Sequence, residues 1–297
     1  MNFETILRQL VEVAENEKNQ FDDQNAWTEQ SAQTNVPHPE SWDIAEVALW
    51  LAKDEYPQLM IEDYLSKLAY FASEIKSQVV GSLQEKVSIL SQYLFEKIGF
   101  QGNKDNYYDP LNSYLNEVID RKLGIPISLS VIVMRVARGV GLEVRGVALP
   151  GHFILKAIQG EESVLFDPFN KGKILDVDQC EQLLESAIGY RLELTPDLLV
   201  PAATRLIISR MLNNLKSIYV EKKDYPRASR VIDRLCTLHP QDYGQKRDLG
   251  IIYYQCQQFG KAIDPLQAYI KQFPDASDAS DVKKLIHLAK QNLQMWN

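Results

Sequence analysis

Residues 124–153 read GIPISLSVIVMRVARGVGLEVRGVALPGHF and decide the fold. Proline is tolerated at the first position of a helix and glycine is typical just after its end, so Pro126 and Gly141 predict a helix over residues 126–140. The sequence then changes to short segments rich in Val, Ile, Leu and Phe, separated by turn residues. These segments are EVRGVAL (143–149), FILKAI (153–158) and SVLFD (163–167). They predict an antiparallel meander directly after the helix.

Helical patterns fill the chain before this stretch. A short amphipathic helix and a polar linker are predicted over residues 1–40. Further helices are predicted to follow, one beginning near the N-cap Ser41 and another at a capping box formed by Ser82 and Glu85. We therefore expect an α+β domain over residues 41–198, in which a layer of helices packs on an antiparallel sheet.

The last third of the chain carries an internal repeat. Like residues recur at a separation of 34 positions, which is the period of tetratricopeptide repeats. The pairs are Leu215 and Leu249, Tyr219 and Tyr253, Tyr225 and Phe259, Ala228 and Ala262, and Pro240 and Pro274. Each repeat is a helical hairpin in which an alanine lets the two helices approach and a proline ends the second one. An all-α domain is therefore predicted over residues 199–297, with repeats at about 209–242 and 243–276.

Composition and charge exclude several classes of partner. The 297 residues are 45% hydrophobic and carry a net charge of −8, without the basic face that nucleic-acid binding needs. No run approaches the roughly 20 apolar residues of a membrane span and the N-terminus has no leader pattern, so we expect a cytoplasmic protein without a membrane partner. Cys180, Cys236 and Cys256 form no C-x-x-C pair, so we expect buried, reduced thiols and no metal site.

One chain order carries a candidate chemistry. Papain-like and transglutaminase-like thiol enzymes place a nucleophile at a helix N-terminus, a histidine on a neighbouring strand and an Asp or Asn on the next strand. Here the helix that begins at Pro126 is followed by His152 and then by Asp167. Side chains of adjacent antiparallel strands meet on one face, so we expect this pair to meet. The two residues either keep a binding role or form a buried polar pair that joins two strands.

Several motifs resemble known families. Transglutaminase-core domains have a cysteine two residues after a glycine, then a histidine and an aspartate, and Gly124, His152 and Asp167 stand in that order here. A closer resemblance is to the bacterial family named after the invasion-gene regulator sirB. The motifs that carry it are GFQGN (99–103), YYDPLNSYLNEVIDR (107–121), GIPISL (124–129), PGHF (150–153) and DPFNKG (167–172). The resemblance implies a transglutaminase-like (papain-like) domain followed by tetratricopeptide repeats.

The resemblance also indicates site residues. Alignment on Gly124 puts Pro126 where the thiol enzymes have cysteine, and proline has no nucleophilic atom. The histidine and the aspartate of the triad carry over to His152 and Asp167. Ser128, still in the first helical turn, is either activated by His152 or bonded to a free backbone N–H. The residues predicted to line a binding cleft are Asn112, Asn116, Glu117 and Pro126. The asparagines and the glutamate either line that cleft or anchor the preceding loop.

Two functions remain open at this point. In the first, the transglutaminase-like domain is non-catalytic, its cleft binds a peptide or small ligand, and the repeats recruit a protein partner in an interaction or regulatory role. In the second, the domain is an acyl-transfer or amide-hydrolysing enzyme that uses Ser128 with His152 and Asp167. We favour the first, because Pro126 removes the thiol. We expect no cofactor and no metal ion.

Overall fold

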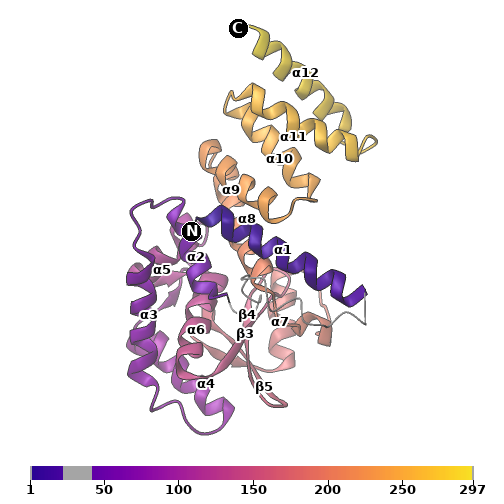
Figure 1. Ribbon diagram of the computed structural model, residues 1–297. Coiled ribbons are helices and arrows are strands. Elements are labelled where there is room, and N and C mark those ends of the chain that lie inside the picture. The colour runs from indigo at the N-terminus through magenta and orange to yellow at the C-terminus, as the bar shows by residue number, and fades with distance from the viewer. Residues whose placement is uncertain (1, 23–41, 296–297) are drawn as a thin grey trace. The chain divides into compact units, whose positions relative to one another are not determined.

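The computed structural model describes residues 2–22 and 42–295 of the chain (Figure 1). Within these residues the chain forms two compact units. The first unit contains residues 2–3 and 42–211, and the second unit contains residues 4–22 and 212–295. The linker predicted before residue 41 lies outside the described residues.

Helices and a small antiparallel sheet make up the first unit, which has the predicted α+β composition (Figure 1). Its longer helices are α2 (Ile44–Lys53), α3 (Ile61–Ile75), α4 (Leu83–Ser91), α5 (Leu115–Arg121), α6 (Pro126–Val140) and α7 (Val177–Ile188). Its short helices are η3 (Gln92–Lys97), η4 (Pro110–Asn112), η5 (Pro168–Asn170) and η6 (Pro196–Leu199). Its strands are β1 (Gln101–Gly102), β2 (Leu123–Gly124), β3 (Glu143–Val147), β4 (Ile154–Gln159), β5 (Glu162–Asp167) and β6 (Lys173–Leu175).

Polar side chains set where two of these helices begin. The carboxylate of Asp43 accepts a hydrogen bond from the Ala45 N–H at 3.0 Å and caps α2. The cap is thus Asp43 instead of Ser41, which lies outside the described residues. The predicted capping box of α4 is confirmed, because Ser82 Oγ accepts from the Glu85 N–H at 3.3 Å and Glu85 Oε2 accepts from the Ser82 N–H at 2.8 Å.

α6 is the central helix of the first unit and has the predicted bounds. Pro126 occupies its first turn, and Gly141 follows it with the left-handed φ of 80° that suits a helix end. Its middle turns are buried almost all round. One side lies close to α3, because a Cβ placed on Gly139 would come within 2.5 Å of the Ala72 Cβ. The other side packs against β3 and β4, so α6 joins the helical layer to the sheet.

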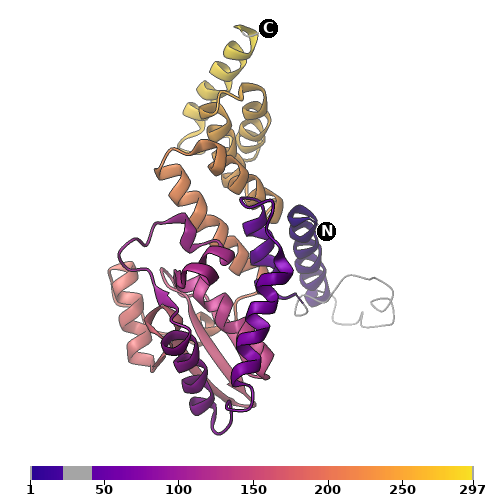
Figure 2. The same ribbon diagram turned by 90° about the vertical axis from the view of Figure 1, so that its left-hand side faces the viewer.

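The sheet has the strand order β3-β4-β5-β6, with every neighbouring pair antiparallel. Its first three strands are the predicted meander. β6 and α7 were not predicted, nor was the short parallel pairing of β1 with β2. α7 supplies Cys180 and Leu184 to a core cluster with Val147 and Ile154 of the sheet, so the sheet is covered from this side as well (Figure 2). Local patterns miss β6 because it is only three residues long.

The remaining elements among the described residues are helices. They are α1 (Phe3–Asp22), α8 (Thr204–Glu221), α9 (Tyr225–Leu238), α10 (Tyr243–Gln255), α11 (Phe259–Gln272) and α12 (Ala279–Met295). The predicted N-terminal helix is confirmed by α1. α8 belongs to the first unit up to Met211 and to the second unit from Leu212 on, whereas the predicted boundary near residue 199 lies before this helix.

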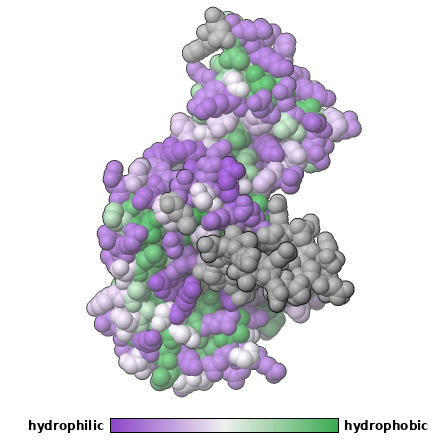
Figure 3. Space-filling view, in the orientation of Figure 1, coloured by the Kyte–Doolittle hydropathy of each residue, from purple (hydrophilic) through white to green (hydrophobic). Residues whose placement is uncertain are grey.

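Small side chains allow the repeat helices to approach, as the 34-residue pattern predicted. Ala228 and Ala262 are fully buried, and a Cβ on Gly250 would lie 2.5 Å from Leu266 Cγ. Figure 3 shows mainly hydrophilic residues on the visible surface, with hydrophobic residues in separate small groups. No helix in the described part of the chain is long and apolar enough to cross a membrane.

Candidate functional site

A tight turn carries His152 into β4. The His152 N–H donates to the Leu149 carbonyl at 3.2 Å, with Pro150 and Gly151 between them. Gly151 has a φ of 69°, as the third residue of a type II turn requires. A Cβ at this glycine would also lie 2.6 Å from the Ala187 Cβ. The sequence Pro-Gly-His therefore fixes the backbone position from which the His152 side chain projects.

The imidazole meets a buried carboxylate at the end of β5. His152 Nε2 lies 3.0 Å from Asp167 Oδ2, and the two side chains are 13% and 0% exposed. The carboxylate also accepts from the Phe169 N–H at 2.9 Å and from Asn170 Nδ2 at 2.6 Å. The predicted meeting of His152 with Asp167 is therefore present, and the short helix η5 holds the carboxylate in place.

Electrostatics keep this carboxylate ionised. Burial alone would raise the pKa of Asp167, but the hydrogen bond and charge of His152, together with the Asn170 and Phe169 donors, hold that pKa below its ordinary value of 3.8. An ionised carboxylate only accepts hydrogen bonds, so Nε2 carries the proton that the pair shares. In the neutral ring, Nδ1 is then the nitrogen with a lone pair, able to accept a proton from a neighbouring group.

Ser128 lies in the first turn of α6 and is fully buried. Its Oγ donates to the Asn112 carbonyl at 2.6 Å and accepts from the Ile125 N–H at 3.1 Å. Among the described residues it makes no hydrogen bond to the His152 ring. These contacts are those of a serine that caps a helix and ties it to the preceding segment. Pro126, at the cysteine position of the resemblance, is also buried.

The other predicted cleft residues do not gather around His152. Asn112 is fully buried, accepts from Asn103 Nδ2 at 3.0 Å and donates to the Asn106 carbonyl at 2.8 Å, so its amide anchors the preceding loop. Asn116 is buried on α5, and its Oδ1 has no hydrogen-bond partner among the described residues. Glu117 is partly exposed on the same helix.

Four residues near His152 were missed by sequence reasoning. Arg210 on α8 donates from Nη1 to the His152 carbonyl at 2.8 Å and from Nη2 to the Leu149 carbonyl at 2.7 Å. The ring of Phe169 lies 6.3 Å from the His152 ring and 6.0 Å from the Tyr107 ring, edge to face in both cases. Lys104 Nζ lies 5.9 Å from the centre of Phe169. Arg210 lies beyond the predicted domain end at residue 198, and no local pattern links these residues to the turn.

The cysteines are free thiols with raised pKa values. Burial raises the pKa of Cys180 to about 11 and that of Cys236 to about 12, with nearby aspartates adding to both shifts. Burial also raises the pKa of Cys256. Cys180 is buried as predicted, but Cys236 and Cys256 are partly exposed, Cys236 on α9 and Cys256 directly after α10. All three therefore stay protonated at neutral pH and are poor nucleophiles.

Comparisons with known proteins agree with this architecture. A family model of the transglutaminase-like superfamily matches residues 62–213, and one of tetratricopeptide repeats matches residues 215–287. A UPF0162 protein of Xylella fastidiosa is 34% identical over 264 residues, which cover 86% of this chain and 93% of that protein. Protein SirB1 of Salmonella typhimurium is 29% identical over 223 residues, 74% of this chain and 82% of that protein.

A third relative is much longer than this chain. Human F-box only protein 21 is 33% identical over 160 residues, which cover 51% of this chain but 24% of that protein. No solved structure matches.

Proposed function

Because this chain belongs to the sirB-type UPF0162 family of transglutaminase-like proteins with tetratricopeptide repeats, we propose that it is a non-catalytic interaction protein. In this proposal the transglutaminase-like unit binds a peptide or small ligand near His152, and the repeats recruit a protein partner. Tetratricopeptide repeats generally mediate contacts between proteins, and this supports a protein-interaction module.

The position of Ser128 carries the proposal. A nucleophilic serine needs a base within hydrogen-bond reach of its hydroxyl. The Ser128 hydroxyl instead donates to the Asn112 carbonyl, and its oxygen accepts the Ile125 N–H. Pro126 offers no nucleophilic atom, and the raised thiol pKa values argue against a displaced cysteine. These observations support a unit in which His152 and Asp167 have no nucleophile to activate among Ser128, Pro126 and the cysteines.

One observation favours the alternative of an acyl-transfer or amide-hydrolysing enzyme. A carboxylate orients the imidazole, as in an active triad, although Asp167 binds Nε2 and leaves Nδ1 as the proton-accepting nitrogen, whereas in the Ser-His-Asp triad Asp binds Nδ1 and Nε2 is the base. For Ser128 to use this nitrogen, its hydroxyl would have to give up its bonds to the Asn112 carbonyl and the Ile125 N–H at the first turn of α6. The buried hydrogen bonds of that turn oppose this movement.

Affinity capture from the native cell tests the role of the repeats. The bait is the full chain, compared with a chain that ends after Glu221. This end point retains all of α8, because the α8 residues Ile207 and Ile208 are buried in the first unit. Loss of the captured partner from the shortened chain, with retention by His152→Ala, is the expected result. Capture that survives the truncation but not His152→Ala would move the interaction to the first unit.

A further inference from the structure

Two cations lie next to the His152 turn without an acidic partner. The guanidinium of Arg210 donates to the carbonyls of His152 and Leu149, and the Lys104 ammonium donates to Asn170 Oδ1 at 3.2 Å. Among the described residues neither cation forms an ion pair with a carboxylate. The whole chain carries a net charge of −8, so these cations stand out against an acidic background.

Three other partly buried cations of the chain are each paired with a carboxylate. Arg121 lies 3.0 Å from Asp109, and Arg135 lies 2.7 Å from Asp43. Lys216 likewise lies 2.6 Å from Asp248. A cation that is partly removed from water is destabilising unless an anion or good hydrogen bonds compensate it. At Arg210 carbonyl oxygens supply part of that compensation, and no carboxylate does.

The acid that faces His152 is already engaged. Asp167 is fully buried and accepts from His152, Asn170 and Phe169. It therefore cannot neutralise Arg210 or Lys104. Carbonyl groups occupy only part of the five-donor guanidinium fork, so Arg210 keeps N–H donors for a further acceptor.

An aromatic group accompanies these cations. Phe169 lies at its centre, with the Tyr107 ring at 6.0 Å, the His152 ring at 6.3 Å and Lys104 Nζ at 5.9 Å. The phenol of Tyr107 interacts electrostatically with the positive charge of Arg210. Edge-to-face rings of this kind offer a surface for a further flat apolar group.

We propose that Lys104, Tyr107, His152, Phe169 and Arg210 bind a carboxylate carried on an aromatic residue, as at the C-terminus of a peptide. The two cations bind the carboxylate, Arg210 by the fork geometry that suits it, and the rings of Phe169 and Tyr107 contact the aromatic side chain. This inference names the ligand class of the first unit and rests on the proposed function only in taking the His152 region as a binding site.

Nuclear magnetic resonance of the full chain tests this proposal through the histidine rings. The chain has only four histidines, so a His152→Gln variant assigns the His152 ring signals directly. The probes are N-acetylphenylalanine, its amide, N-acetylglutamate amide and inorganic phosphate. N-acetylphenylalanine should shift the His152 signals in a saturable way and bind at least about tenfold more tightly than the other three probes. Added salt should weaken this binding.

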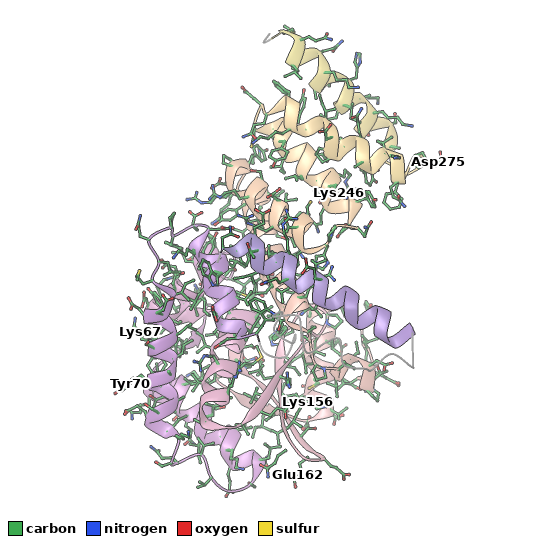
Figure 4. All side chains as sticks on the ribbon, viewed as in Figure 1. Lys67, Tyr70, Lys156, Glu162, Lys246 and Asp275 are labelled. Atoms are coloured by element: carbon green, nitrogen blue, oxygen red, sulfur yellow. The ribbon has the colours of Figure 1, made fainter. Side chains whose placement is uncertain are left out.

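Variants connect the binding to the two cations. Lys104→Gln and Arg210→Gln should each weaken N-acetylphenylalanine binding by about tenfold. The matched control is Lys156→Gln, because Lys156 lies within β4 (Figure 4) and forms no ion pair among the described residues. Arg210→Gln also removes hydrogen bonds to the turn. The exposed Lys104 avoids this complication, and unchanged His152 signals in the probe-free variant show that the turn is intact.

Several results would overturn the proposal. The first is that no probe shifts the His152 signals. The second is that the amide, phosphate or N-acetylglutamate amide binds as tightly as N-acetylphenylalanine. The third is that Lys104→Gln and Lys156→Gln weaken the binding of N-acetylphenylalanine equally. The probes are small and need no protein partner. A failure here is therefore distinct from a failure of the proposed function, which affinity capture tests through the repeats.

Discussion

Two buried polar groups of the first unit differ in what they bind. Ser128 is bonded only to backbone atoms, those of Asn112 and Ile125, and this connects the start of α6 to the segment before it. His152 and Asp167 are bonded to each other, side chain to side chain, and Nδ1 of the imidazole takes no part in that bond. A serine held in this way stabilises a helix start, whereas an oriented imidazole can still bind a ligand. The contacts of Ser128 are therefore those of a helix start, while those of His152 and Asp167 are those of an oriented pair of side chains.

Removal of the carboxylate is expected to have the largest effect. Asp167→Ala leaves Phe169 N–H, Asn170 Nδ2 and His152 Nε2 without their acceptor, and should lower the free energy of unfolding by about 3 kcal/mol. Urea unfolding of the purified chain measures this loss. A loss below about 0.5 kcal/mol, the range of a surface substitution, would contradict the described network.

Asp167→Asn is the matched control and also tests the charge. The folded-state pKa of Asp167 lies below its ordinary value of 3.8. Its ionisation therefore stabilises the native chain fully above that value, and this contribution is lost as the pH falls through the lower folded pKa. The Asn variant should lack this acid-dependent part of the stability. Identical acid unfolding of the two proteins would show that Asp167 is not held in the ionised form.

The Ser128 cluster should give the next largest effect. Ser128→Ala leaves a buried Ile125 N–H and an Asn112 carbonyl without this partner, and should lower the free energy of unfolding by about 2 kcal/mol. Ser130→Ala is the control, because the equally buried Ser130 hydroxyl only donates to Pro126 O within the same helix, at 2.7 Å. Its loss should stay below about 1 kcal/mol. Equal losses of unfolding free energy in Ser128→Ala and Ser130→Ala would contradict a special structural role for Ser128.

Pro126→Cys should change stability least. It tests whether a thiol at the start of α6 responds to the His152 imidazole. If the start of α6 faces His152 as in thiol enzymes, the new thiol has a pKa below the ordinary value of about 8.5. Pro126 is buried, so the thiolate is followed by its ultraviolet absorbance as well as by alkylation, in a chain without the native cysteines. The pKa should rise again in the His152→Ala background. A thiol pKa that is the same with and without the His152→Ala substitution would mean that the start of α6 and the imidazole do not face each other.

Much of the fold could be predicted because it depends on local spacing. The bounds of α6, the capping box at Ser82 and the meander each rest on residues within a few positions of one another. The 34-residue period needs only like residues at equal distance, and it yielded the repeats. The pairing of His152 with Asp167 could be predicted because two adjacent strands carry them.

The rest depends on long-range packing that no local pattern shows. Arg210 contacts the His152 turn from a helix, and it lies 58 positions after His152 in the sequence. Nothing in the sequence around this arginine predicts that contact. β6 and α7 follow a turn that is set by the buried Asp167 cap of η5. The sequence left Ser128 with two roles, and its bond to the Asn112 carbonyl, 16 positions earlier, favours the one in which it joins the helix start to the preceding segment.

The central claim is that the transglutaminase-like unit lacks a working nucleophile, and covalent labelling of the native chain tests it most directly. The folded protein is incubated with a fluorophosphonate, which modifies serines activated by a histidine, beside an active serine hydrolase as a positive control. Intact mass and peptide mapping then locate any adduct. The account predicts an unmodified chain, because the Ser128 hydroxyl is buried and donates to the Asn112 carbonyl. A stoichiometric adduct on Ser128 that disappears in His152→Ala would contradict it.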